Sequence, residues 1–102
     1  MNIEMITKET EMTVLLDGRL DTTTAPELEQ KLAQGLDSVA AITLDFTKLR
    51  YISSAGLRVL LSLQKKMNAA GGSMVVKNPN ELIMDVFDAT GFVDVLTIVQ
   101  EG

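Results

Sequence analysis

Two adjacent serines are the residues of this chain best placed to take part in chemistry. Ser53 and Ser54 stand between an apolar segment and a stretch of helical periodicity that begins at Ala55. A serine at such a junction usually caps the helix, which stabilises it by about 1 kcal/mol. It can also stand exposed beside the helix N-terminus, where backbone N–H groups receive a phosphate well. The residues themselves leave both interpretations open.

A nucleophilic serine is disfavoured by its surroundings. The segment ISSAG, residues 52–56, does not match the G-x-S-x-G nucleophile elbow. The chain has no histidine that could act as a general base. A serine–lysine pair stays open, although the pattern S-x-x-K is absent at both serines. We therefore expect that the protein is not an enzyme.

A second polar segment, Gly18–Thr24, precedes the first predicted helix. Its glycine and Asp21 are typical of a turn and need no further role. Alternatively, Asp21, Thr22 and Thr23 stand at the same end of the sheet as Ser54, with Asp21 as a polar neighbour of the hydroxyl.

The second predicted helix carries a polar side as well. Arg58, Ser62, Lys65 and Lys66 point mainly outward in a helix that starts near residue 55. Such residues usually form a solvated face. They would also suit the rim of a surface that binds a partner, and the spacing does not separate the two interpretations.

Composition and charge exclude several classes of function. The formal net charge of −5 argues against nucleic acid and against an anionic membrane surface as the main partner. The absence of cysteine and histidine removes disulfides and the commonest metal ligands. Neither the G-x-G-x-x-G pattern nor the phosphate-binding P-loop pattern occurs. We therefore expect no cofactor, no metal and no nucleic-acid partner.

The sequence predicts neither a targeting segment nor a membrane-spanning segment. Residues 1–5 lack a basic start followed by a long apolar run. The longest apolar stretches fall far short of the roughly 20 residues that span a bilayer. We therefore expect one cytoplasmic domain, residues 1–102, with no direct membrane insertion.

The first third of the chain predicts a hairpin and a helix. Ile3–Lys8 and Met12–Asp17 flank a short polar connection. Little alternation in the second segment predicts burial on both faces, and Gly18 then breaks the strand pattern. Thr24 and Glu27 predict a capping box, with Pro26 in the first turn. The apolar stripe of this helix is formed by Leu28, Leu32 and Leu36.

The middle of the chain predicts a central strand and a long helix. Val39–Phe46 is typical of a strand, and residues 47–52 are interpreted as a connection. The helix follows over residues 55–70 and is stopped by Gly71 and Gly72.

The last third of the chain again predicts alternating strands and helices. Ser73–Lys77 is a short predicted strand, and Asn78–Glu81 is a capping signature with Pro79 at the first helical position. Gly91 ends this helix, and Val93–Val99 is a last strand or an apolar tail. The apolar face of the helix is predicted to comprise Leu82, Ile83, Val86 and Phe87. The order β-β-α-β-α-β-α-β predicts an α/β fold, a mixed sheet packed with helices.

Several segments together resemble one known family. Residues 45–61, DFTKLRYISSAGLRVLL, are similar to the signature of STAS domains, the sulfate-transporter and anti-sigma-factor-antagonist family. GRLD at residues 18–21, followed by TAP at 24–26, resembles an earlier loop of the same family. Residues 71–76, 78–79 and 90–92 fit its ending, so that the resemblance covers nearly the whole chain.

This resemblance implies a STAS-type fold and a bacterial partner-switching protein without enzymatic activity. The unphosphorylated form would bind an anti-sigma factor that is also a serine kinase of the histidine-kinase-like ATPase type, and sigma factor would be released. Phosphorylation on one serine would end the complex, and a PP2C-type phosphatase would restore it. The position matches Ser54, with Ser53 as second choice. Asp21 matches the family's acidic loop residue. The expected partner-binding residues are Asp21, Thr22, Thr23, Ser53, Ser54, Ala55, Gly56, Arg58 and Ser62.

The sequence leaves open a different role within the same family. STAS-like domains also serve as scaffolds of signalling assemblies and as accessory subunits of membrane transporters. In that case Ser54 would be a helix cap or a contact to another partner.

Overall fold

The fold is a five-stranded sheet with the strand order β1-β2-β3-β4-β5. A computed structural model describes residues 1–101. The elements run in the order β1 (Asn2–Lys8), β2 (Glu11–Leu20), α1 (Ala25–Ala33), β3 (Ala41–Ile52), α2 (Ser54–Ala69), β4 (Ser73–Lys77), α3 (Glu81–Thr90), the 3-10 turn η1 (Phe92–Asp94) and β5 (Ile98–Val99). The predicted order of strands and helices is confirmed.

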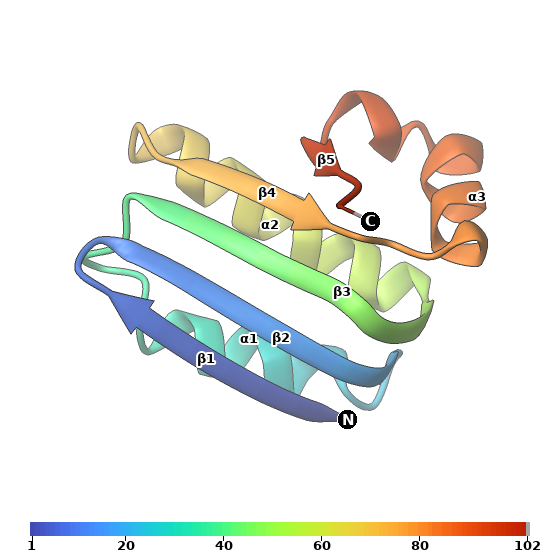
Figure 1. Ribbon diagram of the computed structural model, residues 1–102, viewed down its shortest axis with the longest axis horizontal. Helices are drawn as coiled ribbons and strands as arrows, with labels where there is room; N and C mark the ends of the chain where they lie inside the picture. The colour runs from blue at the N-terminus through green and yellow to red at the C-terminus, as the bar shows by residue number, and fades with distance from the viewer. Residues whose placement is uncertain (102) are drawn as a thin grey trace.

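Only the first strand pair is antiparallel. β1 pairs antiparallel with β2, whereas β2, β3, β4 and β5 run parallel to one another. Each parallel connection moves one strand along the sheet, and right-handed crossovers then place every helix on the same face. Figure 1 shows α1 and α2 side by side behind the sheet. Phe87 of α3 packs against Phe46 of β3, with ring centroids 6.5 Å apart.

The core lies between the sheet and the helices. Along β2 the side chains of Met12, Val14 and Leu16 are buried, while Thr13 and Leu15 between them are only half-buried. This alternation shows that one face of β2 meets the helices and the other does not. The prediction that β2 is buried on both faces was wrong.

Two strands are longer than predicted because the ladder between them contains bulges. β2 continues through Gly18 to Leu20, and β3 continues through residues 47–52 to Ile52. The register between β2 and β3 shifts at two places, and at each shift β3 has one extra residue. A bulge breaks the two-residue alternation that marks a strand. Gly18 has a φ of +123°, a backbone conformation that favours glycine, so it lets β2 continue where a strand end was predicted.

The helix starts correct three further predictions. Thr24 makes no side-chain cap, so the predicted capping box with Glu27 is absent, although the proline does lie in the first turn. Asn80 is the N-cap of α3, which places Pro79 before the helix and not at its first position. Leu82, predicted on the apolar face of α3, is 54% exposed, because it points away from the sheet at the start of the helix.

The predicted helix ends fit better than the last strand. Gly91 is the left-handed C-cap of α3, and Gly71 adopts the same left-handed conformation one residue beyond Ala70, the C-cap of α2. Of Val93–Val99, only Ile98–Val99 forms a strand, because the 3-10 turn η1 takes up the beginning of this segment.

Candidate functional site

Two loops meet at the carboxyl ends of β2 and β3. Leu20 and Ile52 are the last paired residues of these strands. The Ser53 N–H donates to the Leu20 carbonyl oxygen at 2.9 Å. Asp21 and Ser53, each one residue beyond the pairing, therefore start from adjacent points on the same edge of the sheet. The expectation that Asp21 and the serines share one end of the sheet agrees with this geometry.

The two serines differ in role: one caps α2, and the other has an exposed hydroxyl. Ser53 has extended backbone geometry and is the N-cap of α2, and its Oγ accepts the Gly56 N–H at 3.4 Å. Ser54 is the first residue of the helix and is exposed. Among the described residues, its hydroxyl has no hydrogen-bond partner. Ser53 is thus the cap, and the Ser54 hydroxyl is free to react or to bind.

Gly56 explains why α2 begins so close to the sheet. A Cβ atom built on this glycine would lie 2.8 Å from Ile52 Cγ1 and 2.8 Å from Leu20 Cγ, which is closer than real Cβ contacts. Both neighbours are buried. The missing side chain therefore lets the first turn of α2 rest directly on the ends of β2 and β3, and it fixes the height of Ser54 above them. Gly56 itself is buried.

The Asp21 loop is held by hydrogen bonds within itself. Asp21 Oδ1 accepts the N–H groups of Thr23 at 3.0 Å and Thr24 at 3.1 Å. Thr24 Oγ1 accepts the Asp21 N–H at 2.8 Å and donates to the Arg19 carbonyl oxygen at 2.7 Å. The Thr24 hydroxyl therefore closes this loop, whereas the predicted capping box would have used it to cap α1. No hydrogen bond to Asp21 Oδ2 is present within residues 1–101.

These contacts set the charge of the loop. The Thr24 N–H, together with Thr23 and the nearby Arg19, lowers the pKa of the Asp21 carboxyl below its ordinary value, while partial desolvation opposes this shift. The Arg19 guanidinium lies 4.3 Å from the centre of the Tyr51 ring on the neighbouring strand. Asp21 therefore presents a fixed, ionised carboxylate at neutral pH.

A groove joins the two loops to the helices. About 320 Å³ in volume, it is lined by Thr22 before α1 and by Ala55 and Arg58 of α2. Its other wall comes from α1, which sequence reasoning did not include, and these residues are Ala25, Pro26 and Glu29. The handedness of consecutive crossovers could have found them, because it places α1 beside α2.

The remaining predicted residues lie around this groove. Thr23 is exposed in the loop and does not line it. Ser62 is half-buried two turns along α2 from Ser54, where it lines a separate shallow hollow with Glu29 and Lys66. Of the predicted partner-binding residues, Thr22, Ala55 and Arg58 line the groove, and Ser62 lines the separate hollow.

Residues 1–101 contain no group of three or more acidic, histidine or cysteine side chains that could hold a metal ion. In the same part of the chain, no helix has the length and apolarity needed to cross a bilayer. The candidate site comprises the Ser54 hydroxyl at the N-terminus of α2 and the ionised carboxylate of Asp21.

Comparison with known proteins gives consistent results. A family model described as the STAS domain matches residues 2–101. The anti-sigma-B factor antagonist of Bacillus subtilis is 29% identical over 96% of this chain and 90% of its own length. The anti-sigma-B factor antagonist of Staphylococcus epidermidis is 30% identical over 100% of this chain and 94% of its own. The phosphorylated form of the Bacillus cell fate determinant SpoIIAA has the same fold, with a TM-score of 0.80 and 18% identity over 99% of this chain and 92% of that one.

Proposed function

The chain belongs to the STAS domain family, within it to the anti-sigma factor antagonists, and on this premise we propose a phosphorylation switch at Ser54. Members of this group are regulators and not enzymes. The unphosphorylated protein binds an anti-sigma factor that is also a serine kinase of the histidine-kinase-like ATPase type. Phosphorylation of Ser54 by this kinase ends the complex, and a PP2C-type phosphatase restores binding. The scheme operates in the cytoplasm, where sigma factors act.

The observation that carries the proposal is the free Ser54 hydroxyl at the start of α2. It is exposed, and Ser53 already supplies the cap, so that modification of Ser54 costs the helix no hydrogen bond. Ser53 is the poorer phosphate acceptor because its Oγ is engaged with Gly56. Ser54 is therefore the residue we assign to the kinase.

The domain itself tolerates the added phosphate. A phosphoserine brings about −1.5 to −2 charges at neutral pH. At a helix N-terminus such charge is stabilised by about 0.3–1 kcal/mol. Arg58 lies one turn further along α2 and is exposed, so its guanidinium is available to the phosphate. The cost of phosphorylation thus falls on the complex and not on the fold.

The bound partner would cover the groove and both loops. Thr22, Ala55 and Arg58 line the groove, and Asp21 offers its free Oδ2 to a cationic group of the anti-sigma factor. A phosphate on Ser54 would add bulk to this interface, would have to lose its hydration shell, and would repel acidic groups of the partner. Like charges placed together in an interface cost several kcal/mol of binding free energy. The anti-sigma factor therefore dissociates from the phosphorylated protein.

Calorimetry with the kinase encoded in the same genome tests this proposal. Ser54→Ala keeps wild-type affinity and takes up no phosphate in a kinase assay read by mass spectrometry. Ser54→Asp weakens binding by about tenfold or more. Ser38→Asp, which adds the same charge at an exposed loop serine, is the matched control and keeps wild-type affinity.

Equal affinity of wild type and Ser54→Asp would sink the switch. Phosphate found on Ser53 would keep the mechanism and correct the residue. A kinase complex that forms without any phosphorylation would favour the role of a scaffold or of an accessory subunit.

A further inference from the structure

The face of the sheet opposite the helices is bare. All-parallel sheets are found almost only with both faces covered, and four of the five strands here run parallel. Yet α1 and α2 both lie behind the sheet (Figure 1), and α3 packs through Phe87 on Phe46, whose side chain is on that same buried side. The cross-strand register places Glu4, Leu15, Asp45 and Lys77 side by side on the bare face. The next row holds Ile6, Thr13, Thr43 and Val75, and Ile6 is 52% exposed. This helix-free face is therefore partly apolar.

A hollow of about 230 Å³ opens in the helix-free face. It lies where the register between β2 and β3 shifts after Leu15 and Asp45, so a bulge separates the side chains there. Leu15 provides an apolar floor. Three carboxylates, those of Glu4, Asp17 and Asp45, form most of the rim together with Thr47 and Lys48.

The nearby lysines compensate the charge of these three carboxylates only in part. Lys77 is the register neighbour of Asp45 on β4, but its Nζ pairs with Glu101 at 3.2 Å. Lys48 is opposite Asp17 in the register and lines the same hollow, yet the Lys77–Glu101 pair is the one ion pair within residues 1–101. The rim thus has a surplus of two negative charges.

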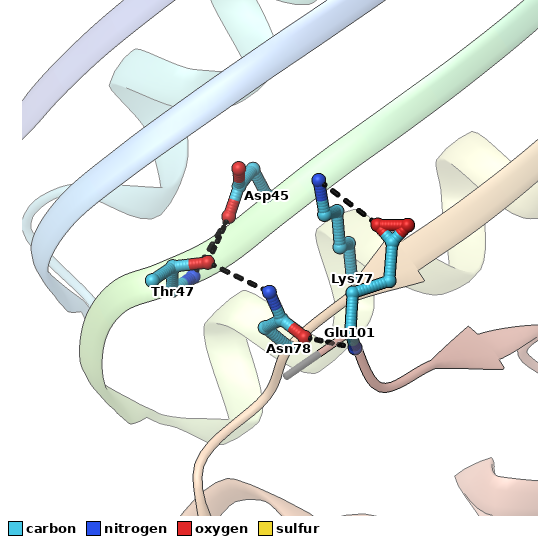
Figure 2. Close-up of polar contacts among 5 residues, drawn as sticks. All are labelled: Asp45, Thr47, Lys77, Asn78 and Glu101. Atoms are coloured by element: carbon cyan, nitrogen blue, oxygen red, sulfur yellow. Dashed lines mark hydrogen bonds and ion pairs between the residues drawn. The ribbon is translucent and has the colours of Figure 1, made fainter.

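One rim carboxylate is held in place by a chain of hydrogen bonds. Asp45 Oδ1 accepts the N–H of Thr47 at 2.9 Å and its hydroxyl at 2.6 Å. Thr47 Oγ1 in turn accepts Asn78 Nδ2 at 3.1 Å, and Asn78 Oδ1 accepts the Glu101 N–H. Figure 2 shows this series beside the Lys77–Glu101 pair. Asp45 Oδ2 accepts no hydrogen bond in the described part of the chain and remains available.

We propose that the helix-free face is a second docking surface, which binds a partner protein through a lysine or arginine side chain inserted into this hollow. The aliphatic stem of such a side chain packs on Leu15 while its cationic head meets the carboxylates. The apolar floor and the negative rim together select this occupant and disfavour an acidic or a purely apolar segment.

This surface is independent of the phosphorylation switch. Ser54 begins a helix on the opposite face of the sheet, and none of the residues that line the hollow is a serine. A partner held here stays bound in both states of Ser54. The protein would then connect a constant partner to a switched one.

The experiment is a titration of the 15N-labelled full chain, followed by NMR, with the blocked peptide acetyl-Gly-Arg-Gly-Arg-Gly-amide. We expect saturable shifts of the amides of Leu15, Asp17 and Asp45, with a dissociation constant on the order of 1 mM. The double variant Glu4→Gln/Asp17→Asn, which removes two carboxylates without a hydrogen bond in residues 1–101, weakens binding about three- to tenfold. The same peptide with citrulline in place of arginine produces no saturable shift.

Two further variants make the test specific. Asp85→Asn/Asp88→Asn changes the net charge equally on exposed positions of α3 and leaves the peptide affinity unchanged. Ser54→Asp also leaves it unchanged, which separates this surface from the proposed switch.

Three results would overturn the proposal. Equal weakening by both double variants would show attraction to net charge alone, and equal binding of the citrulline peptide would show that the carboxylates do not recognise the cation. Sedimentation velocity provides the third. A dimer that the Glu4→Gln/Asp17→Asn variant dissociates would show that a second copy of this chain covers the face.

Discussion

The Ser54 end of the sheet and the helix-free face hold their polar groups in opposite ways. At the Ser54 end, one hydroxyl stands free on a base of buried residues, since Gly56 packs against Leu20 and Ile52. On the helix-free face, three carboxylates and Lys48 line the hollow, and the lysine beside Asp45 is engaged by Glu101. Under the two proposals above, the switched site places a neutral, modifiable group on a fixed base, whereas the second docking surface presents permanent charge.

Leu20→Ala tests the claim that the Ser54 end rests on the core. Leu20 is fully buried at the end of β2, directly below Gly56. We expect a loss of about 2–5 kcal/mol in the free energy of unfolding, from lost burial and from the cavity that remains. Urea denaturation followed by circular dichroism measures it.

Ile6→Ala on the helix-free face is the matched contrast. Ile6 is 52% exposed, and its truncation should cost less than about 1 kcal/mol, since little of its surface leaves water on folding. Equal losses for the two variants would mean that the helix-free face contributes to the core as the helical face does, and the comparison would fail.

The sequence predicted the fold well where regular periods held. The order of elements and the glycine stops after α2 and α3 followed from local patterns. The end of β3 did not, because its buried residues there are Phe46, Leu49 and Ile52, three residues apart. Bulges cause this spacing, and a period of three matches neither strand nor helix. Bulges depend on pairing with β2, which a single segment does not reveal.

The candidate site was predicted by residue type and only partly by role. Ser53, Ser54 and Asp21 were singled out, and the structure brings their loops together. The division between capping Ser53 and free Ser54 depends on where α2 begins, a boundary that propensity does not fix to one residue. The α1 wall of the groove and the hollow on the helix-free face are tertiary features, formed by residues far apart in the chain.

Ser53→Ala and Ser54→Ala compare the contributions of the two serines to stability, and the expected differences are smaller. Removal of the cap at Ser53 should lower the free energy of unfolding by about 0.5–1 kcal/mol, at the low end for N-caps because its hydrogen bond is long. Ser54→Ala should leave stability unchanged, since its hydroxyl bonds to nothing in the described residues. Urea midpoints of the two variants against wild type measure the difference. The reverse order would place the cap on Ser54 and remove the reason for its free hydroxyl.

The smallest expected effect concerns the pH dependence of the Asp21 loop. The N–H groups of Thr24 and Thr23 hold the pKa of Asp21 below its ordinary value in the folded protein. A carboxyl of lowered pKa stabilises the fold above its unfolded pKa of about 3.9, and this contribution is lost as pH falls through the folded pKa. Asp21→Asn keeps an oxygen that can accept the same N–H groups but cannot titrate.

Urea midpoints of wild type and Asp21→Asn between pH 5 and about pH 2 therefore decide the point. Wild type should lose more stability than the variant over this range, and the two should be closest at the acid end. Asp37→Asn, the same change at an exposed loop carboxylate, controls for net charge. Parallel curves for wild type and Asp21→Asn would show that the N–H groups of the loop do not stabilise the ionised carboxylate.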